Sequence, residues 1–139
     1  TIAQGSQSDH ISAFWDLMPT FAELAGTPLS TPTDGISFVD ELLGKEQREH
    51  DFLFWEYNDG GGAMAVRMGD WKAIRTGINK DVNSPIELYN LSEDVGETTD
   101  LAAQYPDLVD KADLIMQREH IKNDDFPFKH EKQQPEVQN

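Results

Sequence analysis

The first strong pattern is an apolar stripe at helical spacing over residues 14–25, followed by Gly26. Residues three and four apart share one face of a helix, and a glycine often ends a helix in the left-handed conformation. Pro19 removes a backbone hydrogen bond inside a helix, so Asp16 is an alternative capping residue for a shorter helix. A second, short helix is expected over residues 37–43.

From residue 52 onward the apolar period shortens to that of a β-strand. Gly69 and Asp70 separate two alternating segments, which predicts a hairpin with a two-residue turn that begins on glycine. The segments with the composition or alternation of strands are residues 52–57, 63–68, 71–75 and 86–89. We therefore expect a small antiparallel sheet of about four strands.

A further apolar stripe follows Pro106, a residue type that favours the first turn of a helix. Its members recur at helical spacing and are Leu108, Val109, Ala112, Ile115 and Met116. Such an apolar face would lie across the predicted sheet. The expected fold class is α+β, with a helical segment first and then a small antiparallel sheet covered by a C-terminal helix.

Composition and charge exclude several classes of protein. The chain has 139 residues and no cysteine, and its 26 Asp and Glu against 11 Lys and Arg give a net charge of −15. An acidic chain repels phosphate backbones and anionic lipid instead of releasing their counterions. No apolar run approaches the ~18 residues that a membrane span requires. We expect neither a nucleic-acid partner nor a membrane partner.

Candidate catalytic and metal-binding side chains are scattered along the chain. The histidines lack the three- or four-residue spacings of metal ligands and are interpreted as surface residues; they are His10, His50, His120 and His130. Glu56 and Asp59 flank a predicted strand end, where two carboxylates ~5 to 9 Å apart could serve as acid and base. With 26 acidic residues in the chain, a solvated face is the competing interpretation.

Ordered motifs with plausible gaps run through residues 8–128. The earlier group comprises Ser8-Asp9-His10, Asp16-Leu17-Met18-Pro19-Thr20, Leu24-Ala25-Gly26, Asp34-Gly35-Ile36-Ser37-Phe38 and Leu42-Leu43-Gly44. The later group comprises Phe54-Trp55-Glu56, Ala65-Val66-Arg67-Met68-Gly69-Asp70-Trp71-Lys72, Glu87-Leu88-Tyr89-Asn90-Leu91 and Gly96-Glu97-Thr98-Thr99-Asp100-Leu101. The first group resembles the end of the catalytic domain of the sulfatase family, and the second resembles that family's C-terminal subdomain. The resemblance is closest to the arylsulfatase and N-acetylgalactosamine-6-sulfatase branch.

The resemblance implies three parts. Residues 1–50 would be the tail of an alkaline-phosphatase-like α/β catalytic domain, residues 51–128 the C-terminal subdomain, and residues 129–139 a disordered tail. The chain would then pack on the N-terminal catalytic domain of a longer protein. Without that domain, the apolar stripe over residues 14–25 would be exposed and would drive the chain to form homo-oligomers.

The resemblance also implies an activity. Sulfatases hydrolyse sulfate esters of aryl groups, sugars and glycosaminoglycans with calcium and with a formylglycine that is made from Cys or Ser in a C/S-x-P-S-R motif. The chain contains no such motif, so no catalytic or metal-binding residue is transferred to it. Calcium and formylglycine are expected in the missing N-terminal part, and this chain alone is expected to be inactive. The family's usual location implies export to the periplasm, the lysosome or the cell exterior.

Loops are the places where such a subdomain could touch a sulfated glycan or aryl sulfate, because connecting loops vary in sequence and extend from the surface. The candidates for the rim of the substrate pocket are Asn58, Asp59 and Arg75, with solvated loop or strand-end residues as the competing interpretation. Arg67 and Lys72 are instead expected to lie on a sheet face and pair with carboxylates.

The alternative function is a free-standing carbohydrate-binding or scaffold module without catalysis. Its aromatic platform would lie on one face of the sheet and consist of Phe54, Trp55, Tyr57 and Trp71. A glycan-binding screen distinguishes this module from a sulfatase segment.

Overall fold

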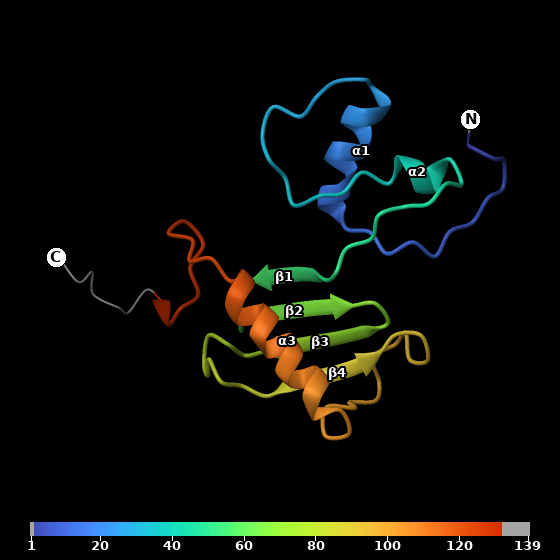
Figure 1. Ribbon diagram of the computed structural model, residues 1–139. Helices are drawn as coiled ribbons and strands as arrows, with labels where there is room; N and C mark the ends of the chain where they lie inside the picture. Colours follow the sequence, from blue (N-terminus) through green and yellow to red (C-terminus); the bar gives the residue numbers. More distant parts are fainter. Residues whose placement is uncertain (1, 132–139) are drawn as a thin grey trace. The chain divides into compact units, whose positions relative to one another are not determined.

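A computed structural model of the chain describes residues 2–131. The chain forms two compact units, Thr1–Asp51 and Phe52–Asn139. The first contains short helices, and the second contains a sheet with one longer helix (Figure 1). In the described part of the chain, no helix has the length and apolar character that crossing a membrane requires.

The first unit follows the apolar stripe of the sequence. A 3-10 turn, Phe14–Asp16, leads into α1, Leu17–Leu24, and the short helix α2 follows at Val39–Leu42. Pro19 lies in the first turn of α1, where its missing N–H removes no intrahelical bond. Gly26 has a φ of 65°, the left-handed conformation that ends the helix as predicted.

The second unit contains an antiparallel sheet with the strand order β1-β2-β3-β4. The strands are β1 Leu53–Tyr57, β2 Ala63–Met68, β3 Trp71–Thr76 and β4 Ile86–Asn90. Met68 pairs with Trp71 across the two-residue turn, and Gly69 has a φ of 57°, so the predicted hairpin is confirmed. Successive residues of each strand point to opposite faces of this sheet.

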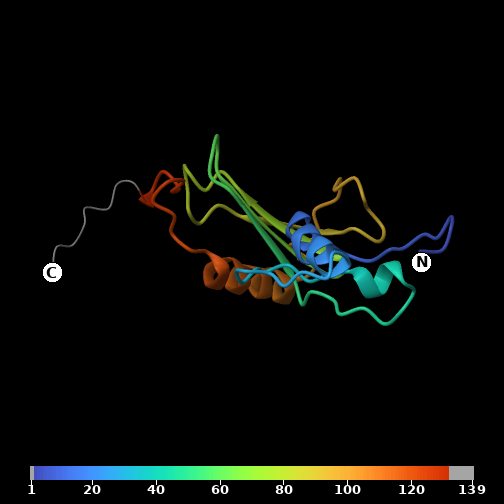
Figure 2. The same cartoon turned by 90° about the horizontal axis from the view of Figure 1, so that it is seen from above.

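Helix α3, Pro106–Glu119, covers one face of the sheet (Figure 2). Pro106 takes the first helical position, as the sequence predicts. The buried helix side chains are Ala112, Ile115 and Met116. Their sheet partners in the core are Met64, Val66, Met68, Ala73, Ile86 and Leu88. The α+β class, with a small antiparallel sheet covered by a C-terminal helix, is confirmed.

The chain adds one more core residue after α3. Phe128 is completely buried and belongs to the same apolar cluster as the helix and strand residues. Its N–H donates to Oε2 of Glu131 at 2.7 Å. Of the predicted disordered tail, residues 129–131 are therefore described and include this contact, whereas residues 132–139 lie outside the described residues.

Candidate functional site

Three segments meet at one end of the sheet (Figure 1). They are the loop 58–62 after β1, the loop 77–85 after β3 and the segment 121–131 after α3, and we call them together the loop end. The first two are joined by backbone hydrogen bonds, from Asn79 N to Gly61 O and from Gly77 N to Gly62 O, both at 2.9 Å. The loops 58–62 and 77–85 therefore form one surface.

Asn79 ties all three segments together. Its Nδ2 donates to the carbonyl oxygens of Asn58 at 3.0 Å and Gly60 at 3.3 Å, and its Oδ1 accepts the N–H of Lys129 at 2.7 Å. The amide uses its donor and its acceptor at once, which no carboxylate can reproduce when ionised. Sequence reasoning missed Asn79 because a lone asparagine in a polar loop has no distinguishing spacing.

Two of the predicted rim residues lie in the loop 58–62. Asn58 donates through Nδ2 to the carbonyl oxygen of Phe126. Asp59 accepts the N–H of Gly60 through Oδ1 at 2.7 Å and is exposed. Of this pair, Asp59 thus presents its carboxylate to solvent, whereas the Asn58 amide holds the segment after α3. Their contact with a substrate stays a prediction.

Arg75, the third predicted rim residue, lies on β3 and binds helix α3. Its Nη1 donates to Oδ1 of Asp113 at 2.9 Å, and its Nε donates to the carbonyl oxygen of Ser84 at 2.9 Å. The side chain is only 15% exposed. These contacts link sheet, helix and loop, and a contact with substrate stays a prediction for this residue as well.

His120 lies between two carboxylates at the end of α3. Its Nδ1 is 2.5 Å from Oε1 of Glu56 on β1, and its Nε2 is 3.0 Å from Oε1 of Glu131. Burial opposes the charged imidazole, but the hydrogen bonds to Glu56 and Glu131 outweigh burial and raise the pKa of His120. Burial also opposes the charged form of Glu131, yet the bonds from His120 and from the Phe128 N–H lower its pKa. The interpretation of His120 as a surface residue is wrong, because its side chain is 23% exposed and bound at both nitrogens.

A cavity of ≈ 210 Å³ adjoins this cluster. Its polar lining consists of Arg75, Gln117, His120 and His130. Nδ1 of His130 is buried and has no hydrogen-bond partner among residues 2–131. The ring stacks on Phe128 at a centroid distance of 5.8 Å. His130 is therefore not the solvated surface residue that the sequence suggests.

The predicted acid–base pair of Glu56 and Asp59 gains no support from this geometry. Glu56 is bound to His120, and Asp59 is bound to its own neighbour, Gly60. Within residues 2–131, no group of three or more His, Asp or Glu side chains could hold a metal ion. Glu56 and Asp59 are thus held by separate contacts.

The face of the sheet opposite α3 carries a hollow of ≈ 540 Å³. Its lining includes Trp55, Arg67, Lys72 and Glu97. Lys72 pairs with Glu97 at 2.6 Å, as predicted for a sheet-face residue. Arg67 differs from the prediction, because its Nε donates to the carbonyl oxygen of Gly69 at 3.1 Å and not to a carboxylate.

The predicted aromatic platform is wrong. Phe54 pairs with the core residue Val66, and both Phe54 and Trp71 pack against the core on the α3 side. Trp55 neighbours Phe54 along the strand and therefore points to the opposite face. The four aromatic residues are split between the two faces of the sheet, so they cannot form one sugar-stacking surface.

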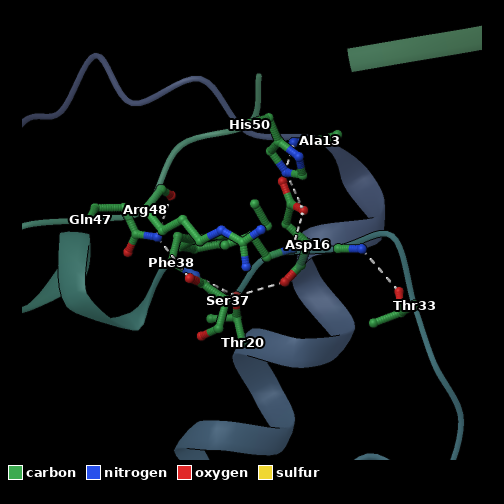
Figure 3. A network of polar contacts seen from close by, with 11 residues as sticks. Ala13, Asp16, Thr20, Thr33, Ser37, Phe38, Gln47, Arg48 and His50 are labelled. Atoms are coloured by element: carbon green, nitrogen blue, oxygen red, sulfur yellow. Dashed lines mark hydrogen bonds and ion pairs between the residues drawn. The ribbon is translucent and has the colours of Figure 1, made fainter. Parts of the chain in front are cut away.

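The first unit contains a network around a buried carboxylate (Figure 3). Asp16 is 1% exposed, and it accepts the N–H of Ala13 at 2.7 Å and the N–H of Ile36 at 2.8 Å. Nε2 of His50 lies 2.9 Å from Oδ1 of Asp16. Burial opposes the charge, but these hydrogen bonds outweigh it and lower the pKa of Asp16. His50 is 10% exposed, so its interpretation as a surface residue is also wrong.

Comparison with known proteins gives a consistent relationship. No protein-family model matches the chain. An uncharacterized sulfatase of Schizosaccharomyces pombe is 32% identical over 116 residues, which cover 75% of this chain and 20% of that protein. Arylsulfatase A of Homo sapiens is 35% identical over 107 residues, which cover 62% of this chain and 21% of that protein. This chain is related to the sulfatases.

The sulfatase relationship extends to the fold. The solved structure of a 2-O GAG sulfatase matches with a TM-score of 0.63 and 25% identity over 74% of this chain and 23% of that chain. The chain spans about a fifth of the length of the curated sulfatases that it matches. This share is consistent with the predicted C-terminal portion of a sulfatase.

Proposed function

We propose that this chain is part of a sulfatase that hydrolyses sulfate esters, and that its loop end forms part of the rim of the substrate pocket. The proposal is carried by the sulfatase relationship, at 32% identity over 116 residues. Its substrates would be aryl sulfates or sulfated glycans. The protein would act in the periplasm, in the lysosome or outside the cell.

The nucleophile and the metal would come from outside this chain. The sequence has no cysteine and no C/S-x-P-S-R motif, and no acidic or histidine cluster of the described part could hold a metal ion. Formylglycine and calcium therefore do not fit the residues present, and no step of the reaction is assigned to them. The chain would contribute by packing on the catalytic domain and by shaping the pocket.

The gene and the encoded activity test this proposal together. Sequencing of the DNA upstream of the Thr1 codon should reveal, in frame, a C/S-x-P-S-R motif. The longer protein should hydrolyse 4-nitrophenyl sulfate and lose this activity with a calcium chelator, whereas the 139-residue chain alone should not. An upstream sequence without the motif would refute the proposal and favour the alternative, a module without catalysis.

The rim assignment has its own test in the longer enzyme. Asp59 presents its carboxylate at the loop end, so Asp59→Ala should change KM for a sulfated oligosaccharide at least about threefold. It should leave KM for 4-nitrophenyl sulfate unchanged, because a small substrate does not reach the rim. Asp70→Ala is the matched control, since Asp70 is an exposed carboxylate in the turn between β2 and β3 at the other end of the sheet. Unchanged KM values for both substrates would remove Asp59 from the rim.

A further inference from the structure

We propose that Glu56, His120 and Glu131 form a protonation-dependent latch that holds the segment 121–131 against the sheet. The inference starts from the two short contacts of His120, at 2.5 Å to Glu56 and 3.0 Å to Glu131. An ionised carboxylate only accepts hydrogen bonds, so both ring nitrogens must donate. A neutral imidazole has one N–H and would turn a lone pair toward one of the two anions. The complete latch therefore requires the imidazolium form.

The latch reaches the rest of the loop end through the segment that it holds. Oε2 of Glu131 accepts the N–H of Phe128, whose side chain fills the core. The next residue, Lys129, donates its N–H to Asn79 of the loop 77–85. Two residues before Phe128, the carbonyl oxygen of Phe126 accepts from Asn58 of the loop 58–62. Release of Glu131 would thus loosen contacts of both loops.

Charged groups face His120 from several elements. Glu56 comes from β1, whereas Glu131 and His130 come from the segment 121–131, and Arg75 of β3 lines the same cavity. On α3 itself, Arg118 pairs with Glu119 at 2.5 Å. Both groups that hydrogen-bond to the ring nitrogens are carboxylates. The C-terminal end of a helix also favours a cation.

The sign of the pH dependence follows from these contacts. The pKa of His120 is raised, so the stability that the latch contributes is fully present below the ordinary histidine pKa of ~6.5. It is lost as the pH rises through the higher pKa of the folded state. Where both carboxylates are ionised, the segment is therefore held below the folded-state pKa of His120 and released above it. A consequence for substrate binding rests on the proposed function, whereas the latch itself does not.

Amide hydrogen exchange in the 139-residue chain tests the latch. After correction for the intrinsic pH dependence of exchange, protection of the Phe128 and Lys129 amides should fall at least about tenfold between about pH 6 and pH 9, because the loss of one hydrogen bond to a charged group has about this effect. The hairpin of β2 and β3 should show no such change. In ¹⁵N spectra, both ring nitrogens of His120 should carry protons at about pH 6. Equal protection at both pH values would overturn the proposal.

Three variants separate the latch from a general loss of structure. His120→Gln is neutral at every pH, so it should give less protection at Phe128 and Lys129 than the wild-type chain has at about pH 6, and its protection should show no pH dependence. His120→Arg keeps a cation with several donors and should retain protection at about pH 9. His10→Gln alters a histidine of the first unit and should leave the wild-type profile intact.

The remaining outcomes are also decisive. A wild-type profile in His120→Gln would overturn the latch. If the hairpin amides show that His120→Gln has unfolded, His120→Arg becomes the test. It must keep the protection of the Phe128 and Lys129 amides at about pH 9. Neither result depends on sulfate ester hydrolysis, so a failed latch and a failed sulfatase assay are distinguishable.

Discussion

Asp16 shows how a single buried carboxylate can organise a unit of this chain. Its two oxygens accept from the Ala13 N–H, the Ile36 N–H and the His50 ring, and Asp16→Ala would leave these groups without their acceptor. Each buried group without a partner costs about 1–3 kcal/mol. We expect Asp16→Ala to lower the free energy of unfolding of the first unit by about 3 kcal/mol. A urea titration followed by NMR at the Ile36 amide measures the change.

The control and the pH dependence sharpen this prediction. Asp34 is exposed in the loop before Ile36, so Asp34→Ala should change stability by less than about 0.5 kcal/mol. The pKa of Asp16 is lowered in the folded state, so its contribution is present above the unfolded value of ~3.9 and is lost as the pH falls through the folded value. If the wild-type chain stays as much more stable than Asp16→Ala in strong acid as it is at neutral pH, the charge of Asp16 does not contribute to stability.

At the level of elements, the local sequence pattern predicts a turn or a helix start where the residues that determine it are neighbours in sequence. Gly69 and Asp70 predict their hairpin because the turn type is set by the turn residues themselves. Pro106 predicts the start of α3 because the first helical position needs no N–H. The alternation of side chains along a β-strand also argues against the aromatic platform, since Phe54 and Trp55 are consecutive residues of β1 and must face opposite sides of the sheet.

The elements of the loop end were harder to predict, because their partners lie far apart along the chain. Glu56 and His120 are separated by 64 positions, and Lys129 and Asn79 by 50. The sequence spacing of a single histidine or asparagine does not predict such a contact, because the contact forms only when the sheet and α3 pack together. Phe128 was missed as a core residue for the same reason: it belongs to the short run Phe126-Pro127-Phe128 in a polar segment, and it joins the core only after the end of α3.

For the whole molecule, two opposing forces decide how copies of the chain interact. One face of α1 and the preceding turn presents large apolar side chains to solvent, and an exposed patch of this kind favours association. Its members and their exposed fractions are Phe14 at 86%, Met18 at 60%, Phe21 at 61% and Leu24 at 59%. Against this attraction stands the net charge of −15 on every copy. Salt weakens the repulsion, because the screening length falls from ~10 Å at 0.1 M to ~3 Å at 1 M.

We therefore propose that the 139-residue chain self-associates, and we predict that its association strengthens with salt. Sedimentation velocity should show the dimer fraction rising as sodium chloride increases, because charge repulsion is screened while apolar burial persists. Phe21→Ser should reduce the dimer fraction at high salt, since it removes an apolar side chain from the centre of the patch. Tyr57→Ser is the control, because Tyr57 is 64% exposed but lies on β1 in the second unit. A chain that stays monomeric at every salt concentration would show that the α1 face does not drive association.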